Sequence, residues 1–183
     1  RHFYRTLSPS MDILISSNVE RLLYYISGGN CAYVADKMRC LAQTGRYVLD
    51  GAALAELRRV FASGFCDDGD TARTISEVFA HNGRLIDTHT AVAVRVCRDL
   101  AIPGMTVIAS TASAYKFADG VLNALGQGHA DGFDAIDRLA HYTGAPIPAP
   151  LESLRGRAVR FDAVIDRDRM DEAAVDFCRT FDL

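Results

Sequence analysis

The sequence lacks the features of several large protein classes. It has no apolar stretch as long as a membrane-spanning helix, and its first ten residues, RHFYRTLSPS, have no apolar core of the kind that signal peptides carry. It has no basic excess either, because 20 lysines and arginines stand against 23 aspartates and glutamates. A nucleic-acid binder would normally concentrate basic residues on one face. We therefore predict a protein that contacts neither membrane nor nucleic acid.

Cysteine is present in an odd number, and no two cysteines form a CxxC pair. This spacing predicts free, mostly buried thiols in a reducing compartment and places the protein in the cytoplasm, with a structural zinc site as the alternative. The sequence also contains no GxSxG, P-loop or HExxH motif. The acidic run 67–70 lacks the spacing of a calcium-binding loop, so we expect Asp70 to cap a helix there. No metal site is predicted. The five cysteines are Cys31, Cys40, Cys66, Cys97 and Cys178.

The 183 residues are 49% hydrophobic, which is enough to bury the core of about one domain. Arg1 is not preceded by a methionine, and patterned sequence begins at once, so we expect a piece of a longer protein. Helical periodicity recurs along the chain. A capping box at 17–20 predicts a helix that carries Val19, Leu22, Leu23 and Ile26 on one face. Further helices are predicted at 30–43, from Asp50, from Asp70, at 90–100, 112–125 and 133–142, and in a tail with Met170, Ala173, Phe177 and Phe181 on one face.

Three short segments resemble strands that lead into helices, at 12–15, 84–86 and 105–109. The last is a continuous apolar run, which is typical of a buried parallel strand. The helix at 90–100 is apolar on nearly every side and needs cover all round. Two or three short parallel strands do not make a complete sheet. The fold class is therefore predicted as α/β, helix-rich, with a few short parallel strands of an incomplete sheet.

Polar residues follow each predicted strand. They are Ser16-Ser17-Asn18, Asp87-Thr88-His89 and Ser110-Thr111. Because ligands of open α/β sheets bind outside the carboxyl ends of the strands, these groups are expected to converge on one crevice. For each group alone, helix capping is the simpler interpretation. A histidine at a helix start, such as His89, is more often a hydrogen-bonded structural residue than a base.

Three sequence blocks carry a family resemblance. SPSMDILISSNVERLLYY (8–25) resembles a characteristic stretch of bacterial threonine synthases, IDTHTAVAV (86–94) resembles their DPHTAV segment, and IASTASAYKFADGVLNAL (108–125) resembles their closing STAHPAKF or STASPYKF segment. The resemblance is strong over residues 1–125 and weak over 126–183. It implies the C-terminal portion of a fold-type II pyridoxal-phosphate enzyme.

The family reaction converts O-phospho-L-homoserine and water into L-threonine and phosphate, with pyridoxal 5'-phosphate as cofactor. By the resemblance, the Schiff-base lysine and the glycine-rich phosphate loop lie earlier in the family chain than the part matched here. The two lysines, Lys37 and Lys116, match neither role. This chain is therefore expected to be inactive alone and to need the N-terminal part of the same protein as partner. Two alternatives are another fold-type II lyase, such as a dehydratase, and a non-enzymatic α/β or helical interaction module.

The resemblance also assigns site residues. Thr111 matches the hydroxyl residue placed against the pyridine nitrogen of the cofactor. Asp87 and His89 match a segment that borders the cofactor, without an assigned role, and no catalytic residue is predicted in this chain. Thr88 and Ala114 stand where the family commonly has proline, which would fix φ at a helix start. Their presence puts loop rigidity in doubt more than activity.

Overall fold

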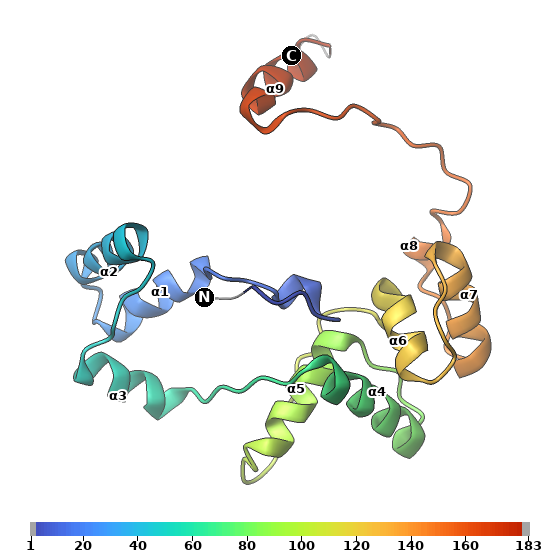
Figure 1. Ribbon diagram of the computed structural model, residues 1–183, viewed down its shortest axis with the longest axis horizontal. Helices are drawn as coiled ribbons and strands as arrows, with labels where there is room; N and C mark the ends of the chain where they lie inside the picture. The colour runs from blue at the N-terminus through green and yellow to red at the C-terminus, as the bar shows by residue number, and fades with distance from the viewer. Residues whose placement is uncertain (1–2, 181–183) are drawn as a thin grey trace. The chain divides into compact units, whose positions relative to one another are not determined.

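The computed structural model describes residues 3–180, which separate into one compact unit up to Pro146 and a second from Ile147 onward. Each unit is described by itself. Arg1 and Phe181, which enter the sequence predictions, lie outside the described residues. The elements in chain order are η1 (Pro9–Met11), α1 (Ser17–Ile26), α2 (Cys31–Thr44), α3 (Gly51–Val60), α4 (Asp68–Asn82), α5 (Thr88–Asp99), η2 (Ala114–Phe117), α6 (Ala118–Ala124), α7 (Gly132–Thr143), α8 (Ala149–Glu152), η3 (Arg167–Arg169) and α9 (Met170–Arg179) (Figure 1).

Side-chain caps and glycines fix the ends of the early helices. Asn30 accepts a hydrogen bond from Tyr33 N at 3.0 Å and starts α2, which ends at Gly45 with φ of 71°. Asp50 accepts from Ala53 N at 2.9 Å and starts α3. A left-handed φ suits glycine because it has no Cβ. The predicted helices at 30–43 and from Asp50 are therefore confirmed.

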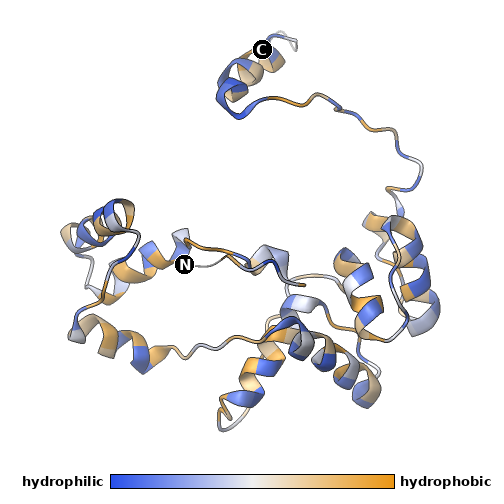
Figure 2. Cartoon of the chain, in the orientation of Figure 1, coloured by the Kyte–Doolittle hydropathy of each residue, from blue (hydrophilic) through white to orange (hydrophobic). Residues whose placement is uncertain are grey.

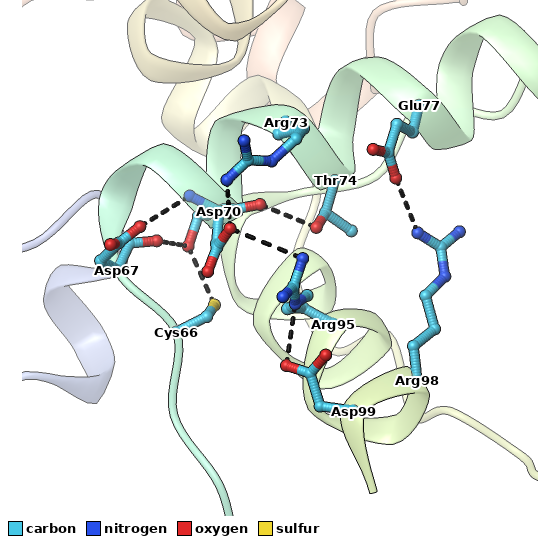
Figure 3. Close-up of polar contacts among 10 residues, drawn as sticks. Cys66, Asp67, Asp70, Arg73, Thr74, Glu77, Arg95, Arg98 and Asp99 are labelled. Atoms are coloured by element: carbon cyan, nitrogen blue, oxygen red, sulfur yellow. Dashed lines mark hydrogen bonds and ion pairs between the residues drawn. The ribbon is translucent and has the colours of Figure 1, made fainter. Parts of the chain in front are cut away.

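Two predicted caps are displaced along the chain. Ser16, with extended backbone and no side-chain bond, precedes α1, so Ser17 is already helical and the predicted capping box is wrong. Asp67 caps α4 by accepting from Asp70 N at 2.7 Å, so Asp70 is not the cap. Asp70 instead pairs with Arg73 and lies 3.5 Å from Arg95 of α5 (Figure 3). A run of acidic residues offers several possible caps, and the backbone conformation selects one.

The core of the first unit lies where α4 contacts α5 and α6, and where α6 contacts α7. Each of these helices directs apolar residues inward, and each buried aliphatic side chain contributes about 1.5–3 kcal/mol. Figure 2 shows hydrophobic and hydrophilic residues side by side along the helices, the pattern of amphipathic helices. The least exposed of these side chains are Ile75, Ala91, Val121, Leu122 and Leu139.

Ion pairs join α4 to α5 on the outer side of this core. Arg98 Nη1 lies 2.9 Å from Glu77 Oε2, and Arg95 Nε lies 2.8 Å from Asp99 in its own helix (Figure 3). Exposed pairs of this kind contribute about 0.2–1 kcal/mol. The Arg98–Glu77 pair joins the two helices, while the apolar contacts supply most of the stability.

The predicted strands are absent from residues 3–180. Residues 84–86 and 105–109 have no regular structure, and 12–15 forms no ladder. Met105 is 97% exposed and Val107 88% exposed. A strand needs a neighbour that pairs with its N–H and C=O groups, and no such neighbour is present within the described residues. The α/β class and its incomplete sheet are therefore not confirmed, and the described chain is helical. The helix at 90–100 is α5, which buries Ala91 but leaves Val94 partly exposed.

The second unit is short and open. α9 presents Met170, Ala173 and Phe177 along one side, as predicted, and Phe177 contacts Phe161 with ring centroids 5.9 Å apart. These side chains line a hollow of about 670 Å³.

The five cysteines are free, but Cys31 and Cys178 are exposed and the other three are half-buried, so the prediction of mostly buried thiols is wrong. Within residues 3–180, no helix is both long and apolar enough to cross a membrane.

Candidate functional site

Asp87 is the buried helix-capping residue at the centre of the candidate site. It is 1% exposed and precedes α5, where its Oδ1 accepts hydrogen bonds from His89 N at 2.9 Å and Thr90 N at 3.2 Å. The negative charge lies at the positive end of the helix dipole, which stabilises both. The helix-capping interpretation of Asp87 is therefore confirmed.

Thr90 connects this cap to a distant loop. Its hydroxyl bonds to Asp87 Oδ2, and its Oγ1 lies 2.9 Å from Ser110 Oγ. The Thr90 hydroxyl donates toward the Ser110 oxygen and also bonds to the Asp87 carboxylate, which only accepts hydrogen bonds. Thr90 is therefore the bridge between Asp87 at the start of α5 and the loop at Ser110.

Thr111 follows Ser110 directly and is exposed. It does not cap a helix, because the next cap is Ser113, whose Oγ accepts from Tyr115 N at 3.3 Å before η2. The predicted helix at 112–125 therefore begins two residues later than expected, and the alternative in which Thr111 only caps it is wrong. The Thr111 hydroxyl remains available at the loop surface.

His89 lies at the first turn of α5, with its ring against Phe117 at a centroid distance of 4.6 Å and an angle of 60°. Within residues 3–180, both of its ring nitrogens are buried without a hydrogen-bond partner, as is Thr88 Oγ1. The expected hydrogen-bonded structural histidine is thus not observed. Buried ring nitrogens without a partner are uncommon, so His89 is a candidate for contact with a polar group.

The structure joins two of the three predicted polar ends. Asp87 and Ser110, from the second and third, share the Thr90 bridge. The bonds of the first end stay within α1, where Ser16 O accepts from Val19 N and Asn18 accepts from Arg21. The segment before η1 instead contacts α4, since Leu7 N donates to Asp68 Oδ1 at 2.9 Å.

Neither lysine is placed in this network. Lys37 in α2 lies over the ring of Tyr33 at 4.9 Å, and Lys116 in η2 lies over the ring of Phe117 at 5.4 Å. Lys116 is exposed. Both ammonium groups therefore have aromatic neighbours on their own helix turn, which accounts for their positions without a covalent role.

Two tethers hold the helices that follow the site. The Tyr115 hydroxyl donates to Ala145 O, and burial raises the pKa of Tyr115, which keeps it a neutral donor. Asp119 accepts from Ala130 N at 3.1 Å and from His129 at 2.9 Å. Partial burial acts to raise the pKa of Asp119, but these bonds outweigh it and lower the pKa.

Known proteins include relatives of this chain, although no protein-family model matches it. Threonine synthase from Pseudomonas aeruginosa is 38% identical over 123 residues, which is 65% of this chain and 26% of that protein. Human threonine synthase-like 1 is 31% identical over 128 residues, 68% of this chain and 17% of that protein. The crystal structure of pyridoxal-phosphate-bound threonine synthase from Brucella melitensis has a TM-score of 0.67 at 35% identity, covering 77% of this chain and 30% of that one.

This chain is similar to threonine synthases in sequence and fold. The resemblance predicted from its sequence blocks is confirmed. The chain spans about a quarter of the Pseudomonas protein, and the solved neighbour carries the predicted cofactor. The similarity concerns a helical part of such an enzyme, since the described residues contain no strand.

Two members of the site were not assigned a role from the sequence. Thr90 was predicted only as the start of a helix, yet it is the bridge between α5 and the loop at Ser110. Phe117 was not singled out, yet it covers the ring of His89. Asp87 precedes Thr90 by three residues at a helix start, and this local spacing predicts a hydrogen bond between their side chains. No spacing rule predicts a contact between residues 20 positions apart.

Proposed function

We propose that this chain forms part of a threonine synthase, which converts O-phospho-L-homoserine and water into L-threonine and phosphate. The observation that carries the proposal is the fold similarity to a pyridoxal-phosphate-bound threonine synthase, at a TM-score of 0.67 and 35% identity. The enzyme would be a carbon–oxygen lyase of fold type II that acts on a phosphate ester. Its small-molecule substrate and the rest of the enzyme would be the partners of this chain.

The residues of this chain suit one part of a pyridoxal-phosphate site. When bound, the cofactor supplies the electron sink that stabilises carbanions. Thr111 would place its hydroxyl against the pyridine nitrogen, as a neutral donor to a neutral acceptor. Asp87 cannot serve there, because its carboxylate is 1% exposed and already accepts three hydrogen bonds. The ring nitrogen would therefore face a hydroxyl, which does not hold it protonated.

His89 and Asp87 would border the cofactor without a catalytic role assigned to either. The unpaired nitrogens of His89 are suited to a polar partner brought by the cofactor, the substrate or the accompanying chain. Asp87 would have a structural role in the site, because it caps the start of α5. No catalytic residue is proposed within this chain, because Lys37 and Lys116 both lie on helix turns outside the network of Asp87.

The test compares two proteins, the complete polypeptide that carries this sequence and the 183-residue chain alone. With pyridoxal phosphate and O-phospho-L-homoserine, the complete polypeptide should release phosphate and form threonine. The chain alone should do neither, and borohydride should trap no cofactor on Lys37 or Lys116. Threonine formation by the chain alone would refute the division of roles. A complete polypeptide that ignores phosphohomoserine but deaminates serine or threonine would favour the dehydratase alternative.

A further inference from the structure

The loop that carries Thr111 has little structure of its own. Residues 105–110 form no regular element, and Met105 and Val107 are almost fully exposed. Loops of this kind are mobile unless a specific contact holds them. A cofactor contact made from such a loop therefore requires a tether close to the residue that makes it.

The hydroxyl of Ser110 provides that tether. It lies 2.9 Å from Thr90 Oγ1, and Thr90 is itself bonded to the buried Asp87 carboxylate at the start of α5. The core holds the other side of α5, through Ala91. The loop is thus connected through Thr90 and Asp87 to a buried part of the unit. Hydrogen bonds in such a chain polarise one another and strengthen the whole.

The network distinguishes two neighbouring hydroxyl residues. Ser110 Oγ accepts from Thr90 Oγ1 at 2.9 Å, which holds Ser110 against α5. Thr111, the next residue along the chain, is exposed and lies outside this network.

We infer that Asp87 and Thr90 are positioning residues for Thr111, which act through Ser110. The inference rests on the proposed function, since it concerns how this chain presents a hydroxyl to the pyridine nitrogen. Asp87 fixes the orientation of Thr90, the Thr90 hydroxyl donates to Ser110, and Ser110 holds the loop beside α5. This tether positions Thr111, the next residue, to face the ligand.

The test uses the complete polypeptide that carries this sequence, in four single variants. Ser110→Ala removes the tether at an exposed position and should not prevent folding. Thr90→Val removes the bridge, and Thr90→Ser retains it. Thr106→Val removes an exposed hydroxyl from the same loop as a matched control. In the cofactor-free protein, amide hydrogen exchange of residues 105–113 should be about threefold to tenfold faster in Ser110→Ala and Thr90→Val. Thr90→Ser and Thr106→Val should exchange as wild type does.

The second measurement is the dissociation constant for pyridoxal phosphate, with Thr111→Val added. Ser110→Ala should weaken binding about threefold to tenfold when Thr111 is present and should have no further effect in Thr111→Val. Equal loss in both backgrounds would mean that Ser110 contacts the ligand itself, which overturns the inference. If Thr111→Val weakens binding but Ser110→Ala changes neither exchange nor affinity, the inference fails while the proposed function stands. If Thr111→Val binds as wild type does, the assigned role of Thr111 fails and the inference fails with it.

Discussion

Replacing Thr111 by valine separates ligand binding from folding at this site. The two side chains have nearly the same shape, and only the hydroxyl is lost. A neutral hydrogen bond contributes about 0.5–1.5 kcal/mol, so the dissociation constant for pyridoxal phosphate should rise about 2- to 12-fold. The loss should be greater if the pyridine nitrogen is left buried without a partner. Since Thr111 is exposed and caps no helix, the free energy of unfolding should change by less than about 0.5 kcal/mol.

Ser113→Ala is the matched control for this variant. Ser113 lies two residues away on the same loop, but its hydroxyl accepts from Tyr115 N at the start of η2. Loss of this cap should lower the free energy of unfolding by about 0.5–2 kcal/mol and leave cofactor affinity unchanged. Affinity is measured by cofactor absorbance titration, and stability by urea unfolding of the same samples. If Thr111→Val lowers stability and spares affinity, Thr111 has a structural role and the reasoning is wrong.

Three further predictions concern the frame of the site. Leu122→Ala should lower the free energy of unfolding by about 2–5 kcal/mol, because Leu122 is 0% exposed. Leu154→Ala in the second unit should change the free energy of unfolding by less than about 0.5 kcal/mol. Equal effects of the two variants in urea unfolding would contradict the assigned core. Because the pKa of Asp119 is lowered in the fold, the stability that its carboxylate contributes is complete above the ordinary value of 3.8 and is lost as the pH falls through the folded pKa. The difference in thermal midpoint between wild type and Asp119→Asn should therefore shrink with acidification below 3.8, and a constant difference would exclude this cause. The 183-residue chain should bind a hydrophobic dye or self-associate through its exposed apolar loop, and Met105→Ser with Val107→Thr should reduce both; unchanged dye fluorescence and sedimentation would show that the loop is not the surface responsible.

The helix boundaries were predictable where local chemistry alone decides them. Asn30 and Gly45 bound α2 because a side-chain acceptor and a left-handed glycine are both local devices. The caps of α1 and α4 were misplaced by one and three residues, since Ser16-Ser17 and Asp67–Asp70 each offer several suitable side chains. The choice between them depends on how the preceding chain enters the helix, which periodicity does not report.

The strands could not be predicted from periodicity because a strand is not a local structure. The run 105–109 has the composition of a buried parallel strand, but its backbone groups need partners on neighbouring chain. Within residues 3–180 no segment pairs with it, and Met105 and Val107 stay exposed. A helix such as α5 satisfies its own backbone and therefore forms with only one side covered.

The sequence placed Asp87-Thr88-His89 and Ser110-Thr111 after neighbouring segments, and Asp87 and Ser110 do share one network. The roles of His89 and Thr111 stay predictions. The bridge made by Thr90 depends on α5 and the loop lying side by side, which follows from packing. The predicted polar end at Ser16–Asn18 did not join them, because α1 packs mainly against α2 and α3.

The buried position of Asp87 supports the proposal that a hydroxyl, and not this carboxylate, meets the ligand. The Asp87 carboxylate accepts hydrogen bonds from two backbone amides of α5 and from the Thr90 hydroxyl, so its interactions lie within the fold. A carboxylate free to reach a pyridine nitrogen would hold it protonated and change the electronic character of the cofactor. With Asp87 buried and bonded to Thr90, which in turn bonds to Ser110, the chain would present Thr111 as a neutral donor in the proposed site. The structural role of Asp87 and the chemical role proposed for Thr111 are thus two consequences of the same hydrogen-bond network.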